Sequence, residues 1–142
     1  MRGSELKQLF LAHVGQTSDG PMSIEVVKAE GCRIIDRNGN EYLDLISGIS
    51  VANMGHGQAS IVKAVQDQAA RYMHTMVYGE HVQSPQVLLA RELTDAIGDP
   101  FDSIYFVNSG SEAIEAAMKL AKRATGQYEL VSFRNAYHGS SH

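Results

Sequence analysis

The sequence predicts an α/β fold, in which an antiparallel meander and several helices precede the first βαβ unit of a larger, truncated parallel sheet. Two observations support this prediction. Between residues 24 and 45, short segments rich in β-branched side chains alternate with turn residues, which is typical of hairpins. Between residues 104 and 133, an apolar segment, a small polar turn, an amphipathic run and a second apolar segment follow in order.

The N-terminal third predicts one helix and a three-stranded meander. Apolar side chains at helical spacing indicate a helix over Glu5–Val14. The strands are expected over Ile24–Ala29, Cys32–Asp36 and Glu41–Leu45. The second connection, Arg37-Asn38-Gly39-Asn40, contains Asn-Gly, which is the strongest short hairpin signal. This part of the chain is therefore expected to form an antiparallel sheet.

The middle of the chain predicts a glycine-rich loop and two helices. Residues 47–57 contain three glycines, so we expect unusual backbone angles there. Apolar spacing indicates one helix over Ser60–Met73. A second helix is expected to begin at Ser84-Pro85, with Ser84 as the capping residue, and to end at Gly98.

The stretch Asn108–Ala113 lies between a predicted strand, Ile104–Val107, and a helix that runs to Thr125-Gly126. A strand, a small polar turn and a helix N-terminus together direct backbone N–H groups and the positive end of a helix dipole at one place, which favours a phosphate. Gly110 allows close approach of the backbone to an anion. An ordinary serine N-cap would use the same residue types, so this turn alone does not distinguish a phosphate-binding turn from a simple N-cap.

After this helix, Tyr128–Phe133 predicts a further strand, and a strand, helix and strand of this length favour a right-handed parallel βαβ unit. A parallel sheet normally has several strands and is covered on both faces. We therefore expect this chain to be the front of a larger domain, although a complete small α+β domain is an alternative.

Composition excludes several classes of protein. The 142 residues carry a formal charge of −4, mixed along the chain, so neither nucleic acid nor a membrane surface is an expected partner. The sequence has no charged-then-apolar pattern of the kind that predicts a signal peptide, and no apolar run of about 18 residues that could span a bilayer. Cys32 is the only cysteine, so no disulfide is expected and the cytoplasm is the expected location.

The run Phe106–Ala121 resembles the cofactor-phosphate segment of class III aminotransferases, which are pyridoxal 5'-phosphate (PLP) enzymes of fold type I. This family includes the acetylornithine, ornithine and 4-aminobutyrate aminotransferases. Further segments resemble the family at its spacing, and together they extend from about Pro21 to near the last residue: Tyr42-Leu43-Asp44, Ser47-Gly48-Ile49, Asn53-Met54-Gly55-His56-Gly57, Thr125-Gly126 and Tyr137-His138-Gly139.

The resemblance implies roles for particular residues. Ser109, Gly110 and Ser111 would hold the cofactor phosphate. Tyr137 would stack on the pyridine ring, and His138 with Gly139 would shape the turn that presents it. Residues 47–53 would lie near the substrate pocket, with Val51 as a candidate pocket residue. Residues 1–50 would belong to the small domain and residues 51–142 to the start of the PLP-binding large domain.

The resemblance also implies which catalytic groups are missing. The Schiff-base lysine and the aspartate that pairs with the pyridine nitrogen have no counterpart among these residues, so no catalytic residue is assigned, and the isolated chain is expected to be inactive. A second departure is that Gly55-His56-Gly57-Gln58 lacks the proline that, in the family, comes one residue after Gly-His. The helix after this motif would begin without that rigid residue.

The resemblance implies an enzyme that moves an amino group from an ω-amino acid or diamine to a 2-oxo acid such as 2-oxoglutarate, and acts as a homodimer. A PLP mutase, racemase or decarboxylase on the same scaffold is one alternative. A non-catalytic domain that binds a phosphate ligand is another. His138 and His142 have a spacing seen in metal sites, but Gly-Ser-Ser between them argues against a helix that presents both, and no metal is expected.

Overall fold

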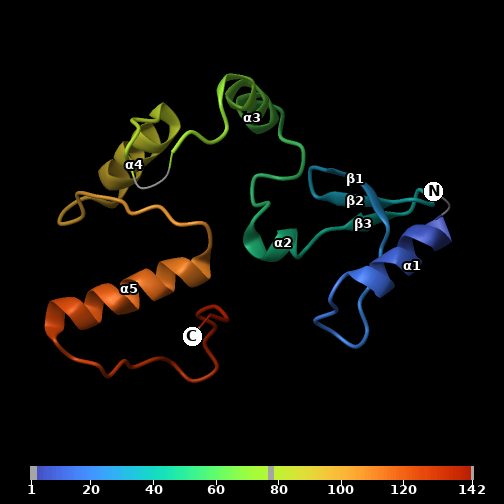
Figure 1. Ribbon diagram of the computed structural model, residues 1–142. Coiled ribbons are helices and arrows are strands. Elements are labelled where there is room, and N and C mark those ends of the chain that lie inside the picture. The colour runs from blue at the N-terminus through green and yellow to red at the C-terminus, as the bar shows by residue number, and fades with distance from the viewer. Residues whose placement is uncertain (1–2, 77–78, 142) are drawn as a thin grey trace. The chain divides into compact units, whose positions relative to one another are not determined.

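The computed structural model describes residues 3–76 and 79–141. The chain divides into two units, one up to Thr75 and one from Met76 onward. The first unit contains α1 (Gly3–His13), β1 (Val26–Glu30), β2 (Arg33–Asp36), β3 (Glu41–Leu43), α2 (Ser47–Ser50) and α3 (Ala59–Arg71) (Figure 1). The second unit contains α4 (Ser84–Ile97) and α5 (Gly110–Thr125).

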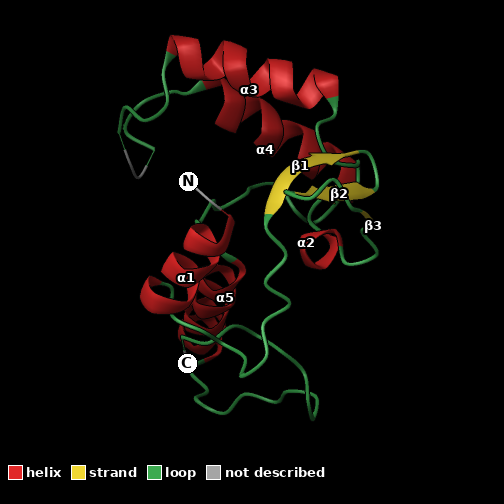
Figure 2. Cartoon of the chain, turned by 90° about the vertical axis from the view of Figure 1, so that its right-hand side faces the viewer, coloured by secondary structure: helices red, strands yellow, loops and turns green. Residues whose placement is uncertain are grey.

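The strands form one antiparallel sheet in the order β1-β2-β3, drawn in yellow in Figure 2. Ile34, in the central strand, lies opposite Ala29 of β1 and Tyr42 of β3. The register shifts once along the β1–β2 pair, between Val26 and Lys28. This arrangement confirms the predicted meander, and each observed strand overlaps its predicted range.

Asp36 closes the β2–β3 hairpin and, at 7% exposed, is the only residue that is buried as a whole among those that the structure describes. Its carboxylate accepts hydrogen bonds from the backbone N–H groups of Asn38 and Asn40 at 2.9 Å, from Asn40 Nδ2 at 2.9 Å and from the Tyr42 hydroxyl at 3.0 Å. These bonds, that of the Asn40 side chain most of all, lower the pKa of Asp36. The hydrogen bond to Asp36 raises the pKa of the Tyr42 hydroxyl.

The predicted helices are present, with ends shifted by one to two residues. α3 begins after Gln58, whose side chain accepts hydrogen bonds from the N–H groups of Ser60 and Ile61. The N-cap of α4 is Gln83, so the prediction that Ser84 caps this helix is wrong. Ser84 is instead the first helical residue, and Pro85 follows in the first turn, where its missing N–H is tolerated. Gly98 ends α4 with a φ of 77°.

The predicted strands at Ile104–Val107 and Tyr128–Phe133 are not formed, so the expected parallel βαβ unit is absent from the described residues. Both stretches are irregular, and Tyr105 and Phe133 are 76% and 87% exposed. A strand exists only where its backbone groups pair with a neighbour, and parallel strands need several neighbours and covered faces. No described segment pairs with either stretch, so the β propensity of their residues is not sufficient to form a strand.

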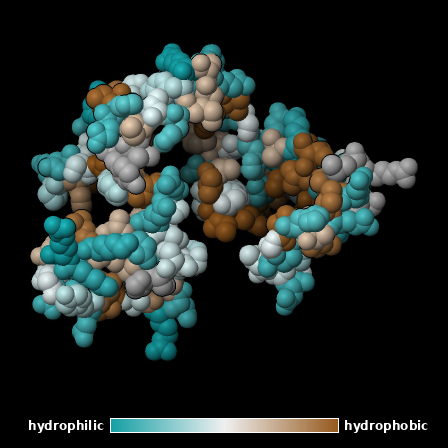
Figure 3. Space-filling view, in the orientation of Figure 1, coloured by the Kyte–Doolittle hydropathy of each residue, from teal (hydrophilic) through white to brown (hydrophobic). Residues whose placement is uncertain are grey.

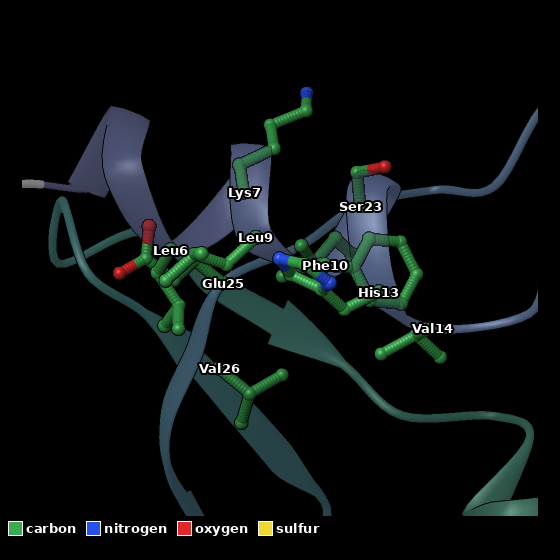
Figure 4. Close-up of a pocket in the computed structure, with 10 residues that line it drawn as sticks. Leu6, Lys7, Leu9, Phe10, His13, Val14, Ser23, Glu25 and Val26 are labelled. Carbon is green, nitrogen blue, oxygen red and sulfur yellow. The ribbon is translucent and has the colours of Figure 1, made fainter.

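Much of the apolar surface is open to solvent. No apolar side chain is fully buried in the part of the chain that the structure describes, and brown apolar surface covers parts of the α1–sheet and α2 regions in Figure 3. α1 and β1 border a cavity of about 560 Å³, into which Figure 4 shows side chains from both elements. Among the described residues, no helix has the length and apolar character needed to cross a bilayer.

Candidate functional site

The first turn of α5 is held by reciprocal hydrogen bonds between side chains and backbone. Ser109 is the N-cap, and its hydroxyl accepts a hydrogen bond from the Glu112 N–H at 3.2 Å. The Glu112 carboxylate reaches back and accepts a hydrogen bond from the Asn108 N–H at 2.7 Å. This arrangement resembles a capping box, shifted by one residue on the return side. Glu112 therefore has a structural partner in the turn itself.

Two backbone N–H groups of this turn have no hydrogen-bond acceptor among the described residues. The Ala113 N–H bonds to the Ser109 carbonyl, and the Glu112 N–H bonds to the Ser109 hydroxyl. Within residues 3–76 and 79–141, the N–H groups of Gly110 and Ser111 have no acceptor. Free donors at a helix N-terminus, together with the positive end of the dipole, form an anion-binding geometry.

The segment after α5 returns to the beginning of the same helix, as Figure 1 shows near the C label. Gly139, with a φ of +97°, lies directly against Ser111. A Cβ atom at position 139 would lie 2.7 Å from Ser111 Cβ and 2.8 Å from Ser111 Cα, closer than real Cβ atoms approach. Only glycine fits this backbone angle and this approach. The predicted Tyr137-His138-Gly139 turn and the predicted phosphate turn are thus neighbours.

The remaining predicted residues of this unit lie on the same two segments. Ser111 and Gly139 are half-buried, whereas Ser109 and Gly110 are exposed. The side chain of Tyr137 is 82% exposed, and that of His138 is also exposed. Both are therefore accessible to a small molecule bound at the start of α5.

The first unit contains a second constellation, the loop from Asp44 to His56. Asp44 Oδ1 accepts hydrogen bonds from the N–H groups of Ile46 and Ser47, at 3.0 and 2.9 Å. Asp44 Oδ2 lies 2.7 Å from His56 Nε2, and because a carboxylate only accepts, Nε2 carries the hydrogen. The bond from His56, followed by those from Ser47 and Ile46, lowers the pKa of Asp44.

Inside this loop, α2 has unusual backbone angles. Its four residues, Ser47 to Ser50, all have positive φ between 50° and 64°. Gly48 accepts such angles without strain, but a residue with a Cβ pays about 1–2 kcal/mol to adopt them. The expectation of unusual backbone angles in residues 47–57 is therefore confirmed. Strain of this kind often marks a functional segment.

Val51, the predicted pocket residue, directly follows α2 and is 79% exposed.

The sequence did not point to a side-chain partner for His56. Asp44 lies 12 residues earlier, a separation that has no pattern of its own, so only the folded chain shows the pair. Of His138 and His142, whose spacing is seen in metal sites, His142 lies outside the described residues. No cluster of three or more metal-ligating side chains occurs within the described residues.

Comparisons with known proteins match most of the chain to one family. Residues 14–142 match the family described as aminotransferase class-III. The acetylornithine aminotransferase of Archaeoglobus fulgidus is 39% identical over 116 residues, which are 82% of this chain and 30% of that protein. The acetylornithine aminotransferase of Bacillus anthracis is 40% identical over 130 residues, which are 92% of this chain and 32% of that protein.

Solved structures give the same result. The crystal structure of acetylornithine aminotransferase from Elizabethkingia anophelis matches 87% of this chain and 31% of its own with a TM-score of 0.76 and 28% identity. Adenosylmethionine-8-amino-7-oxononanoate aminotransferase from Methanocaldococcus jannaschii matches 97% of this chain and 34% of its own, with a TM-score of 0.87 and 26% identity.

The chain thus spans about a third of the length of the relatives it matches. Its fold is that of the matching region in fold type I aminotransferases, which confirms the predicted fold class even though two strands are unpaired here. The chain belongs to the class III aminotransferases, a family of PLP-dependent enzymes.

Proposed function

We propose that this chain contributes the phosphate cradle and part of the substrate pocket to a PLP-dependent aminotransferase. The observation that carries the proposal is the start of α5, where two N–H groups without an acceptor in the described chain adjoin a turn that packs on Ser111. In the proposed site, Gly110 and Ser111 donate their N–H groups to the cofactor phosphate, and the Ser111 hydroxyl adds a third donor.

The residues present fit a phosphate group. The Ser109 hydroxyl accepts from the Glu112 N–H, so its oxygen secures the turn, while its hydrogen remains available to a phosphate oxygen. The Glu112 carboxylate is engaged by the Asn108 N–H. Glu115 forms an ion pair with Lys119 at 3.3 Å. These contacts support structural roles for both carboxylates, which leaves the N–H groups as the groups that meet the anion.

Tyr137 and His138 complete the proposed cofactor site. Because Gly139 packs on Ser111, the preceding two residues are confined near the start of α5. The exposed aromatic face of Tyr137 suits stacking on the pyridine ring, which contributes about 1 kcal/mol beyond the area buried. Val51 and its neighbours in residues 47–53 are proposed to line the substrate pocket.

The proposed reaction moves the amino group of an ω-amino acid or diamine to a 2-oxo acid such as 2-oxoglutarate. When bound, PLP supplies the electron sink for such chemistry. The relatives named above are aminotransferases, which favours amino transfer over the mutase, racemase and decarboxylase alternatives. A non-catalytic phosphate-binding domain finds no support among them.

The Schiff-base lysine and the pyridine-pairing aspartate would come from outside these 142 residues, so we propose that the isolated chain is inactive. We further propose a homodimer located in the cytoplasm, with no nucleic-acid or membrane partner. Within each subunit, residues 1–50 would belong to the small domain, and residues 51–142 would begin the PLP-binding domain.

Ser111→Ala tests the phosphate assignment in the full-length protein. The change removes one hydroxyl donor to a charged group, so the Kd for PLP should rise about tenfold or more. Ser103→Ala is the matched control, because Ser103 is an exposed serine of the same unit whose hydroxyl bonds only to Asp102 among the described residues. Titration of each apoprotein with PLP, followed by absorbance, gives the Kd. An unchanged Kd for Ser111→Ala would contradict the assignment.

A further inference from the structure

Asp44 and His56 close the loop that contains α2. One carboxylate performs two tasks, since Asp44 Oδ1 holds the N–H groups of Ile46 and Ser47 and Asp44 Oδ2 holds His56 Nε2. The side chain of Asp44 is 6% exposed and that of His56 is 25% exposed. The pair therefore fixes the first residues of the turn relative to the last residue of the loop, largely out of solvent.

Both members of the pair are anchored to the sheet through their own backbones. The His56 N–H donates to the Gly31 carbonyl at 2.8 Å, and the Gly31 N–H donates to the His56 carbonyl at 2.9 Å. The Asp44 N–H donates to the Cys32 carbonyl at 2.8 Å. Because Gly31 and Cys32 connect β1 to β2, the loop is fastened at both ends to one hairpin turn.

The Ser47–Val51 turn has a strained backbone and exposes apolar side chains to solvent. Ile49 lies in the left-handed region with φ 61° and ψ 61°, and its side chain is 85% exposed. Val51, which follows the turn, is 79% exposed. Neither side chain gains burial in the described chain that would compensate for the strain, so the geometry favours a role in contact with another molecule.

We propose that Asp44 and His56 are positioning residues that hold the Ser47–Val51 turn in the conformation that contacts the amino donor. This inference rests on the proposed function, because residues 47–53 belong to the proposed substrate pocket. The Asp44 carboxylate already accepts three hydrogen bonds from the protein and its side chain is only 6% exposed, so a substrate has little access to it. The pair acts through the turn and is not itself catalytic.

Two substitutions of His56 separate this role from a general loss of folding. Gln places its amide nitrogen near the position of the imidazole Nε2, so His56→Gln can still donate to Asp44. The shorter Asn side chain ends near the position of Nδ1, so His56→Asn cannot reach the carboxylate. Asp67→Ala is the matched control, because Asp67 pairs with Lys63 at 2.9 Å on the exposed face of α3, in the same unit.

The measurements use the full-length holoenzyme, with kcat expressed per PLP-loaded subunit. His56→Asn should raise the KM for the amino donor about tenfold while the Kd for PLP changes less than about twofold, and His56→Gln should restore most of the KM. Amide exchange at Val51 and Ala52, whose N–H groups both bond to the Ser47 carbonyl, should accelerate in His56→Asn only.

The outcomes are distinguishable. Failure of the wild-type holoenzyme to transaminate any ω-amino acid or diamine would overturn the proposed function, and this inference with it. An active wild type whose amino-donor KM is the same in His56→Asn would overturn the inference alone. Equal losses in the Asn and Gln variants, with lower kcat and an unchanged KM, would show a structural role only. If His56→Asn fails to fold, an unimpaired KM in Asp44→Ala would overturn the inference.

Discussion

Gly139 and Ser111 lie so close together that no side chain larger than hydrogen fits at position 139. A Cβ atom there would come within 2.8 Å of the Ser111 backbone at Cα, and the φ of +97° independently disfavours any residue with a Cβ. The two residues are 28 positions apart in the sequence, yet the return of the chain after α5 makes them neighbours. This contact joins the helix start to the turn that bears Tyr137.

Gly139→Ala should weaken cofactor binding by displacing Ser111. Because the added methyl group meets the Cβ and Cα of Ser111, either the serine or the turn must shift, and we expect the Kd for PLP to rise about tenfold or more. Gly126→Ala is the control, since Gly126 also has positive φ, at +70°, but a Cβ there meets nothing within 4 Å. It should cost about 1 kcal/mol of stability and leave the Kd unchanged. Equal Kd values for all three proteins would contradict the steric argument.

Ser109→Ala should lower stability more than cofactor affinity. The change removes the N-cap bond to the Glu112 N–H and should reduce the free energy of unfolding by about 1 kcal/mol, whereas Ser109→Thr should retain it. Thermal unfolding with and without PLP separates the two effects. If Ser109→Ala instead kept its stability and lost cofactor affinity, the hydroxyl would serve the phosphate and not the cap.

The Asp36 hairpin should lose stability in acid. The pKa of Asp36 is lowered in the folded chain, chiefly by the Asn40 side chain, so its contribution is fully present above the ordinary value of 3.8 and disappears as pH falls through the lower, folded pKa. NMR shifts of the Asn38 and Asn40 amides, which both donate to the carboxylate, should follow this change with a midpoint below 3.8.

Asp36→Asn is the control for this titration, because an amide does not ionise. The variant should show no such midpoint and should be less stable at neutral pH, since its NH₂ group cannot accept from Asn40 Nδ2 or the Tyr42 hydroxyl. A midpoint at or above 3.8 in the wild type would show that the hydrogen bonds do not favour the charged carboxylate.

The local elements follow from the sequence because each depends on neighbours in the chain. The Asn38-Gly39 turn, the helical spacing of α3 and α5, and the glycine at the end of each of α4 and α5 act over a few residues. Ser109 is the N-cap that its residue type predicted. The start of α5 could therefore be located from the sequence, whereas the phosphate that it is proposed to bind is implied by the resemblance to the family segment.

The strands predicted at Ile104–Val107 and Tyr128–Phe133 show where local preference is insufficient. Their β-branched and aromatic side chains favour a strand, but a strand also needs partners in the hydrogen-bonding direction, and the described residues supply none. A residue's preference for a sheet depends on neighbours that the residue does not encode.

The sequence by itself determined the helices, the meander, the Ser109 N-cap and membership of the class III aminotransferases, because periodicity, capping residues and motif spacing are properties of short segments. Only the tertiary structure decided that Asp44 binds His56 and that Gly139 packs on Ser111. Each contact joins residues 12 or more positions apart, and the path of the chain between them depends on backbone hydrogen bonds and steric limits that no local pattern records.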